Sequence, residues 1–158
     1  MAKLLLFGYG NPGRGDDGLG PELVELISSL KLAQVTCQND MQLQVEHVTD
    51  LAEHEMVLFI DADMSCAEPF AFAELRAEKD DSYSSHAMNP AALLYAYQQV
   101  YGKTAPATFL LRIRGYEFGL GDAMSAKATA NLAAANRLVG ILCTAADLAR
   151  WREYAEHA

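Results

Sequence analysis

The 158-residue sequence contains no apolar run close to the roughly 20 residues that a membrane-spanning helix needs. It also has only three cysteines and no C-x-x-C pair. An odd number of cysteines without C-x-x-C spacing argues against a disulfide framework, so we expect a reducing, cytoplasmic setting. The apolar stretch after Lys3 meets Gly8 too early for a signal peptide, and we interpret it as a first strand.

Basic residues are scarce as well. The chain has 12 lysines and arginines against 21 aspartates and glutamates, which gives a formal net charge of −9. Such an excess of negative charge repels phosphate groups, so we expect neither nucleic acid nor an anionic membrane as a partner. A cation or a basic segment of another protein is compatible with it. The charge alone identifies no partner, because acidic composition also serves solubility.

No repeat, low-complexity tract or linker divides the sequence, and its length fits one domain over 1–158. Apolar runs predict strands at 3–7, 33–38, 56–63, 70–78 and 107–115. Helical spacing predicts helices at 21–32, 42–54, 89–102 and 125–155. This alternation favours an α/β fold, a three-layer αβα sandwich with a mostly parallel, twisted sheet of about five strands. We expect 70–78 to be an edge strand, and Gly140 is a candidate point for a bend or break in the last helix.

Acidic residues follow each of the first three predicted strands, and one histidine precedes the third helix. They are Asp16 and Asp17, Asp40, Asp61 and Asp63, and His86. Ligands of parallel sheets bind beyond the carboxyl ends of the strands, so these side chains should converge at one edge. Crowded carboxylates repel one another unless a cation neutralises them. Two carboxylates and one imidazole leave coordination positions open, as in a working metal site, and would accept zinc, nickel, cobalt or manganese.

The glycine loop allows a different interpretation. Gly8, Gly10 and Gly13 have the G-x-G-x-x-G spacing of a dinucleotide-binding turn, and Asp40 could take the ribose-binding role. Two aspartates directly before the helix would oppose a pyrophosphate there. A nucleotide-binding module therefore stands as an alternative. Single residues also have simpler explanations: Asp17 could cap a helix, and His86 could be an ordinary loop histidine.

His47 and His54 lie among acids on a face of a predicted helix, and His157 lies in the carboxyl-terminal tail. We expect His47, His54 and His157 to be solvated.

Three segments, GYGNPGRGDDGLGPELVE, LFIDADMS and SSHAMNPAALL, together resemble the hydrogenase maturation endopeptidases. These enzymes trim the carboxyl-terminal tail from the large subunit of [NiFe] hydrogenases. The family's G-N-x-x-x-x-D-D/E-x-x-G loop is matched from Gly10 to Gly20, and its Asp-Ala pair is matched by Asp61 and Ala62. Its histidine before a helix is matched by His86, and a late glycine and serine segment by GYEFGLGDAMS.

The resemblance implies a function and a set of roles. The metal ligands fall on Asp17, Asp61 and His86, and the metal is nickel already inserted in the precursor, with zinc or another divalent ion able to substitute. The partner is the precursor large subunit, and we expect the enzyme to be a monomer. The metal would polarise the scissile carbonyl and lower the pKa of a bound water that Asp16 or Asp40 orients. No Ser, Cys or Thr has the setting of a covalent nucleophile.

One segment departs from the family pattern. Members commonly carry Asp-Gly-Gly after the second strand, whereas here Met41 and Gln42 follow Asp40. We interpret this as a different substrate groove in a subgroup that serves another hydrogenase type. A protein that senses nickel in the precursor without cutting it, a chaperone, is a further alternative.

Overall fold

The computed structural model describes residues 3–79 and 88–156. Its centre is a five-stranded sheet in the order β2-β1-β3-β5-β4. Four strands are parallel: β1 (Leu4–Tyr9), β2 (Val35–Asp40), β3 (Met56–Asp63) and β5 (Ala107–Arg114). The edge strand β4 (Phe70–Leu75) runs antiparallel to β5. The α/β class, the mostly parallel sheet and the edge position of 70–78 are thus confirmed.

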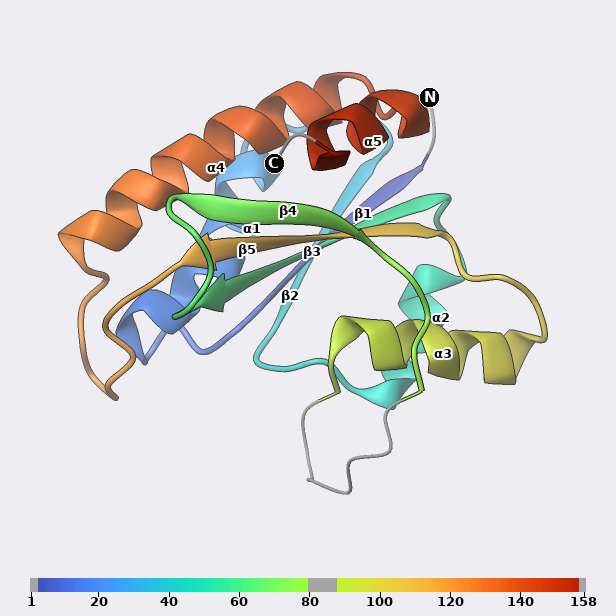
Figure 1. The fold of residues 1–158 in the computed structure, drawn as a ribbon, viewed down its shortest axis with the longest axis horizontal. Coiled ribbons are helices and arrows are strands. Elements are labelled where there is room, and N and C mark those ends of the chain that lie inside the picture. Colours follow the sequence, from blue (N-terminus) through green and yellow to red (C-terminus); the bar gives the residue numbers. More distant parts are fainter. Residues whose placement is uncertain (1–2, 80–87, 157–158) are drawn as a thin grey trace.

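Helices cover both faces of the sheet (Figure 1). On one side lie α1 (Leu19–Ser28), α4 (Ala126–Thr144) and α5 (Leu148–Glu156). On the other lie α2 (Val48–Leu51), which follows a 3-10 turn, η2 (Val45–His47), and α3 (Pro90–Tyr101). A second 3-10 turn, η1 (Gly15–Gly18), leads into α1. These layers confirm the predicted three-layer sandwich.

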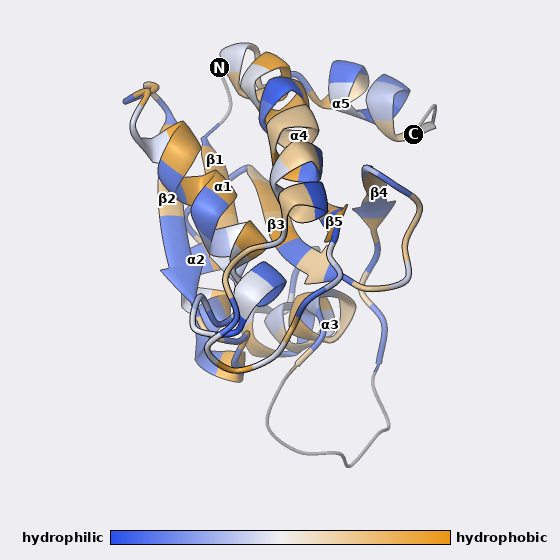
Figure 2. Ribbon diagram, turned by 90° about the vertical axis from the view of Figure 1, so that its left-hand side faces the viewer, coloured by the Kyte–Doolittle hydropathy of each residue, from blue (hydrophilic) through white to orange (hydrophobic). Residues whose placement is uncertain are grey.

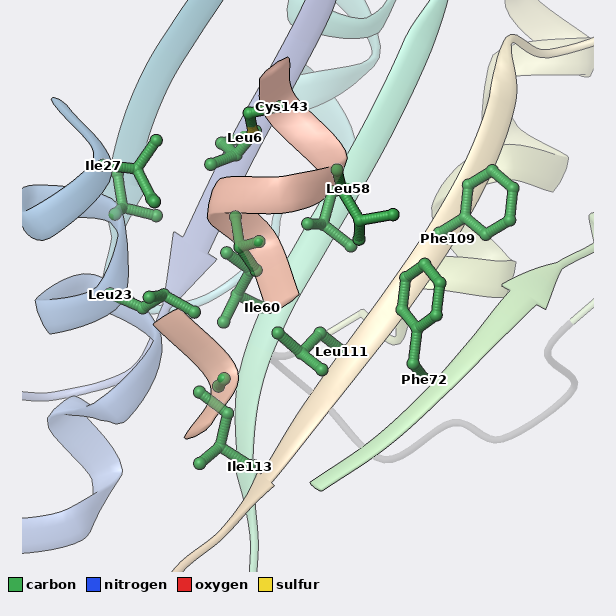
Figure 3. Packing of buried hydrophobic residues seen from close by; sticks show 14 of the residues in the cluster. Leu6, Leu23, Ile27, Leu58, Ile60, Phe72, Phe109, Leu111, Ile113 and Cys143 are labelled. Atoms are coloured by element: carbon green, nitrogen blue, oxygen red, sulfur yellow. The ribbon is translucent and has the colours of Figure 1, made fainter. Parts of the chain in front are cut away.

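Side chains of β1 point alternately into two hydrophobic cores, one on each face of the sheet. Leu4 and Leu6 belong to the cluster under α1, α4 and α5, and Leu5 and Phe7 to the cluster under α2 and α3. Figure 3 shows the first cluster, in which Leu6 of β1 lies between Ile27 of α1 and Leu58 of β3. Figure 2 shows the contrast between the hydrophobic central strand β3 and the more hydrophilic edge strand β2. Burial on both faces explains why β1 and β3 read as continuous apolar runs.

The helix predicted over 125–155 is wrong in one respect: it is two helices. Gly140 lies inside α4, and the break falls after Thr144, where Ala145 adopts extended angles. The cause is the packing of Trp151, which is fully buried against Phe72 and Phe109 and donates its Nε1–H to the Leu142 carbonyl at 3.0 Å. Burial of this large ring turns α5 back over the sheet.

Capping residues define the ends of α3 and α4. Asn89 and Ser125 cap the starts of α3 and α4 by accepting hydrogen bonds from the Ala92 and Ala128 amides. Gly102 ends α3 in the left-handed conformation with φ 64°. The helix predicted over 42–54 is shorter than expected, because only η2 and α2 form within it. Within the described ranges, no helix is both long and apolar enough to cross a membrane.

Candidate active site at the carboxyl end of β1

Three consecutive residues at the end of β1 contact three of the predicted acids. The Tyr9 hydroxyl hydrogen-bonds Asp61 at the end of β3. The Gly10 amide donates to the Asp40 carbonyl at the end of β2, at 3.1 Å. The Asn11 amide donates to Asp17 Oδ2 at 2.7 Å. The structure therefore brings Asp17, Asp40 and Asp61 around the end of one strand.

Asp61 lies where its charge is poorly tolerated. Burial is the main cause that raises the pKa of its carboxyl to about 7, and the negative charge of Asp17 adds to the rise. The Ala62 amide, which donates to Asp61 Oδ1 at 2.8 Å, and the Tyr9 hydroxyl oppose it. A pKa of about 7 means that a part of the molecules carries a proton on this carboxyl at neutral pH.

Asp16, although it neighbours Asp17, has a different environment. It is fully buried, and its carboxylate accepts hydrogen bonds from the amides of Tyr116, Glu117 and Ser125 and from the Ser125 hydroxyl, at 2.7 to 2.9 Å. Burial alone raises the pKa of this carboxyl, but these donors outweigh it and hold the pKa below its ordinary value. Asp16 thus ties the loop between β5 and α4 to the turn that carries Asp17.

Asp40 has a partner that the sequence interpretation missed. Its Oδ2 lies 3.1 Å from Nε2 of His47, and its Oδ1 accepts the Met41 amide at 2.7 Å. The expectation that His47 is solvated is wrong: its exposed fraction is 6% and its ring packs against Phe7, with centroids 4.8 Å apart. No motif links residues 40 and 47, so only the path of the chain after β2 could reveal the pair.

Two further histidines were also expected to be solvated. His54 is half-buried, with Nδ1 at 2.8 Å from the Asp50 carbonyl. His157 lies outside the described residues.

Asp63 does not share this environment. Arg112 Nη1 lies 3.1 Å from its Oδ2, and the Ser65 amide and hydroxyl donate to its Oδ1. Burial raises the pKa of Asp63, but these partners together hold it below the ordinary value. Its charge is already compensated by Arg112, whereas no ion pair to Asp17 or Asp61 is found among the residues that the structure describes.

A groove of about 410 Å³ opens beside the same loop. Its lining combines glycines, prolines and a methionine with acidic and amide side chains: Gly10, Pro12, Gly18, Pro21, Glu22, Glu25, Asn39, Asp40 and Met41. Met41 is 60% exposed. The groove lining therefore combines apolar surface with the carboxylates of Glu22, Glu25 and Asp40.

His86, the third predicted ligand, lies outside the described residues. Among the residues that the structure does describe, no group of three or more His, Cys, Asp or Glu side chains is arranged to hold a metal ion. The chemistry of Asp17 and Asp61 is compatible with a divalent cation, because both side chains offer carboxylate oxygens. A positive charge near them would also offset the repulsion that contributes to the raised pKa of Asp61.

The glycines of the opening loop serve close packing. A Cβ on Gly8 would lie 2.6 Å from the Gly20 carbonyl oxygen at the start of α1. Gly10 has φ 145°, and a Cβ there would collide with the Asp17 carbonyl. The Asn11 amide, which could face a phosphate, is bonded to the Asp17 carboxylate. These contacts account for Gly8 and Gly10 without a nucleotide.

No family model matches the chain, and no curated protein matches it by sequence. Solved structures do match. A [NiFe] hydrogenase maturation protease HycI from Thermococcus kodakarensis KOD1 is 19% identical with a TM-score of 0.70, over 91% of this chain and 94% of that one. A hydrogenase 2 maturation peptidase from a Thaumarchaeota archaeon is 25% identical with a TM-score of 0.63, over 87% and 95%. The hydrogenase maturating endopeptidase HybD from E. coli is 17% identical with a TM-score of 0.68, over 89% and 91%. The resemblance drawn from the motifs is thereby confirmed.

Proposed function

We propose that this chain, which has the fold of the [NiFe] hydrogenase maturation proteases, is an endopeptidase that removes the carboxyl-terminal extension of a hydrogenase large-subunit precursor after nickel insertion. The observation that carries the proposal is the pairing of Asp17 and Asp61 at the end of β1, where burial and mutual repulsion raise the pKa of Asp61 to about 7. A cation presented by the substrate would relieve that repulsion.

The chain's own residues prepare the two carboxylates. The Asn11 amide orients Asp17, and the Ala62 amide and Tyr9 hydroxyl orient Asp61. Both acids therefore meet an incoming ion with little rearrangement, which is how fixed groups favour a reaction. His86 would complete the set by resemblance. The bound metal would supply polarisation of the scissile carbonyl and activation of a water molecule.

Two acids were candidates for orienting that water, and their environments favour one of them. Asp16 is fully buried and saturated with hydrogen bonds from the loop between β5 and α4. The Asp40 side chain is 44% exposed and lines the groove beside Gly10. We assign the role near the substrate to Asp40 and a structural role to Asp16.

Recognition of nickel follows from the same electrostatics. The groove and its neighbouring acids are negative and repel acidic segments, whereas a cation held by the precursor bridges the two proteins. The affinity of this protein for the precursor then depends on whether the precursor holds nickel. The difference in binding free energy between the loaded and the unloaded precursor is the coupling free energy. Cleavage would therefore follow metal insertion.

The test is incubation of the purified protein with nickel-loaded and nickel-free precursor, with the mass of the large subunit as the readout. Only the loaded form should become shorter. Asp17→Ala and His86→Ala should lower the rate of shortening by about 1000-fold or more, because each removes a group that holds the metal. Glu53→Gln is the matched control, since it removes one negative charge at the opposite end of the sheet, beside Lys3 and Gln34.

The outcomes separate the alternatives. Shortening at the normal rate in both site variants would contradict the proposed mechanism. Binding of the loaded precursor without any shortening would favour the nickel-sensing chaperone. Stabilisation by NAD(P) or ATP, but by none of nickel, zinc and cobalt, in a thermal-shift assay would favour the nucleotide-binding module.

A further inference from the structure

Residues 41–47, which follow β2, fix the Asp40 carboxylate by hydrogen bonds. Where the family commonly has two glycines, this chain has Met41 and Gln42. The Met41 amide donates to Asp40 Oδ1 at 2.7 Å, and the next turn of chain, η2, returns His47 to the other carboxylate oxygen at 3.1 Å. Both oxygens of a side chain that is 44% exposed thus have defined donors.

The geometry of His47 defines which nitrogen carries the proton. The Gln44 amide donates to Nδ1 at 2.8 Å, so Nδ1 is an acceptor. Nε2 must then carry the hydrogen, and it donates to Asp40 Oδ2. The imidazole packs edge-to-face against Phe7 of β1, with an angle of 74° between the two ring planes. Phe7 belongs to the hydrophobic cluster under α2 and α3. A buried, doubly bonded imidazole is a rigid support for an exposed carboxylate.

We propose that His47 is a positioning residue for the cleavage reaction: it holds the Asp40 carboxylate at the wall of the groove formed with Gly10, Pro12 and Met41, in the orientation in which it meets the substrate. The inference rests on the proposed function. An exposed aspartate without this support would populate several rotamers, and displacement of a reacting group by about 1 Å can cost about 100-fold in rate.

A purely structural role for His47 makes a different prediction. If the ring only fills space beneath β1, a side chain of similar volume should preserve the reaction. His47→Phe keeps a ring next to Phe7 but loses both hydrogen bonds. His47→Gln keeps a donor close to the position of Nε2. The two variants therefore separate packing from positioning.

The experiment measures kcat/KM for shortening of the nickel-loaded precursor in five proteins: wild type, His47→Phe, His47→Gln, Asp40→Ala, and the double variant Asp40→Ala/His47→Phe. We expect His47→Phe to lose about 10- to 100-fold and His47→Gln to recover most of that loss. The double variant should be no slower than Asp40→Ala alone, because a residue that acts through Asp40 has nothing left to position. Additive losses, or normal turnover in His47→Phe, would overturn the inference.

A second measurement covers the case in which His47→Phe does not fold. In the wild-type protein, the ¹⁵N shifts of the His47 imidazole should show a protonated Nε2 and an unprotonated Nδ1, and Asp40→Ala should change the Nε2 signal. The opposite tautomer would overturn the inference even if cleavage occurs. Failure of the wild-type protein to shorten the loaded precursor would instead remove the proposed function, and the NMR result would still decide whether the Asp40–His47 pair exists.

Discussion

At the scale of single residues, two neighbouring aspartates have opposite tasks. Asp16 is fully buried and accepts hydrogen bonds from amides 100 to 109 positions away in the sequence, from Tyr116 to Ser125. Asp17 accepts one amide, that of Asn11, and lies within electrostatic reach of Asp61. Of these two adjacent aspartates, Asp16 therefore holds a loop, whereas Asp17 is the one proposed to bind a cation.

Replacement of Asp16 by asparagine should destabilise the protein by roughly 2–4 kcal/mol at pH 7, because an amide nitrogen cannot accept the buried hydrogen bonds. The pKa of Asp16 is lower in the folded state, so its contribution is present above the unfolded pKa of about 3.9 and is lost as pH falls through the folded value. Urea unfolding should show a smaller difference between wild type and variant at pH 3 than at pH 7.

Asp122 provides the control for that prediction. It is an exposed acid in the same loop and accepts the Gly119 amide at 2.9 Å. Asp122→Asn should change stability by less than about 1 kcal/mol, since asparagine can still accept there. Equal effects of the two variants would show that Asp16 does not hold the loop.

At the scale of helices, the two glycines Gly140 and Gly20 differ in what surrounds them. Gly140 lies inside α4, and a Cβ there would meet nothing within 4 Å. Gly20 lies in the first turn of α1, where a Cβ would collide with the Ile60 carbonyl of β3. The first glycine is therefore dispensable for packing, whereas the second allows α1 to approach the sheet.

Gly140→Ala should stabilise the protein by about 0.5–1 kcal/mol, because alanine loses less backbone freedom on folding and meets no neighbour. Gly20→Ala, the matched control, should destabilise it. Chemical denaturation followed by the fluorescence of Trp151, the single tryptophan, measures both. Destabilisation by Gly140→Ala would mean that α4 needs the glycine for a bend that the structure does not contain.

At the scale of the whole molecule, a net charge of −9 and the electrostatic repulsion between Asp17 and Asp61 are the physical basis of the cation proposed for the site. The folded pKa of Asp61 is about 7, well above its unfolded value of about 3.9. Above pH 4 the folded state therefore binds more protons than the unfolded state, and the contribution of Asp61 to stability falls as pH rises toward 7. A cation at the site would reverse this loss.

Nickel or zinc ions should consequently raise the thermal midpoint of the protein more at pH 8 than at pH 6. A proton on the Asp61 carboxyl, whose pKa is about 7, competes with the metal ion. The apparent affinity of the protein for the ion should therefore rise about tenfold from pH 6 to pH 8. Asp61→Asn should weaken the effect and its pH dependence. A thermal shift of equal size at both pH values, or one that persists in the Asp17→Ala/Asp61→Asn double variant, would place the ion elsewhere.

Much of the fold followed from the sequence because it depends on local signals. Continuous apolar runs predicted β1 and β3, and alternation with helices predicted the parallel sheet. The convergence of Asp17, Asp40 and Asp61 followed in turn, since the carboxyl ends of parallel strands share one edge. These features need only the order of elements along the chain.

Only the tertiary structure could decide the rest. Whether Asp16 is a reactive acid or a buried anchor depends on residues 100 to 109 positions away, and the support of Asp40 depends on the burial of His47 against Phe7. The end of α4 likewise depends on where Trp151 finds room. The amino-acid order thus determined which groups reach the site, whereas packing between distant segments determined which of them remain exposed, because burial and hydrogen bonding are properties of neighbours in space.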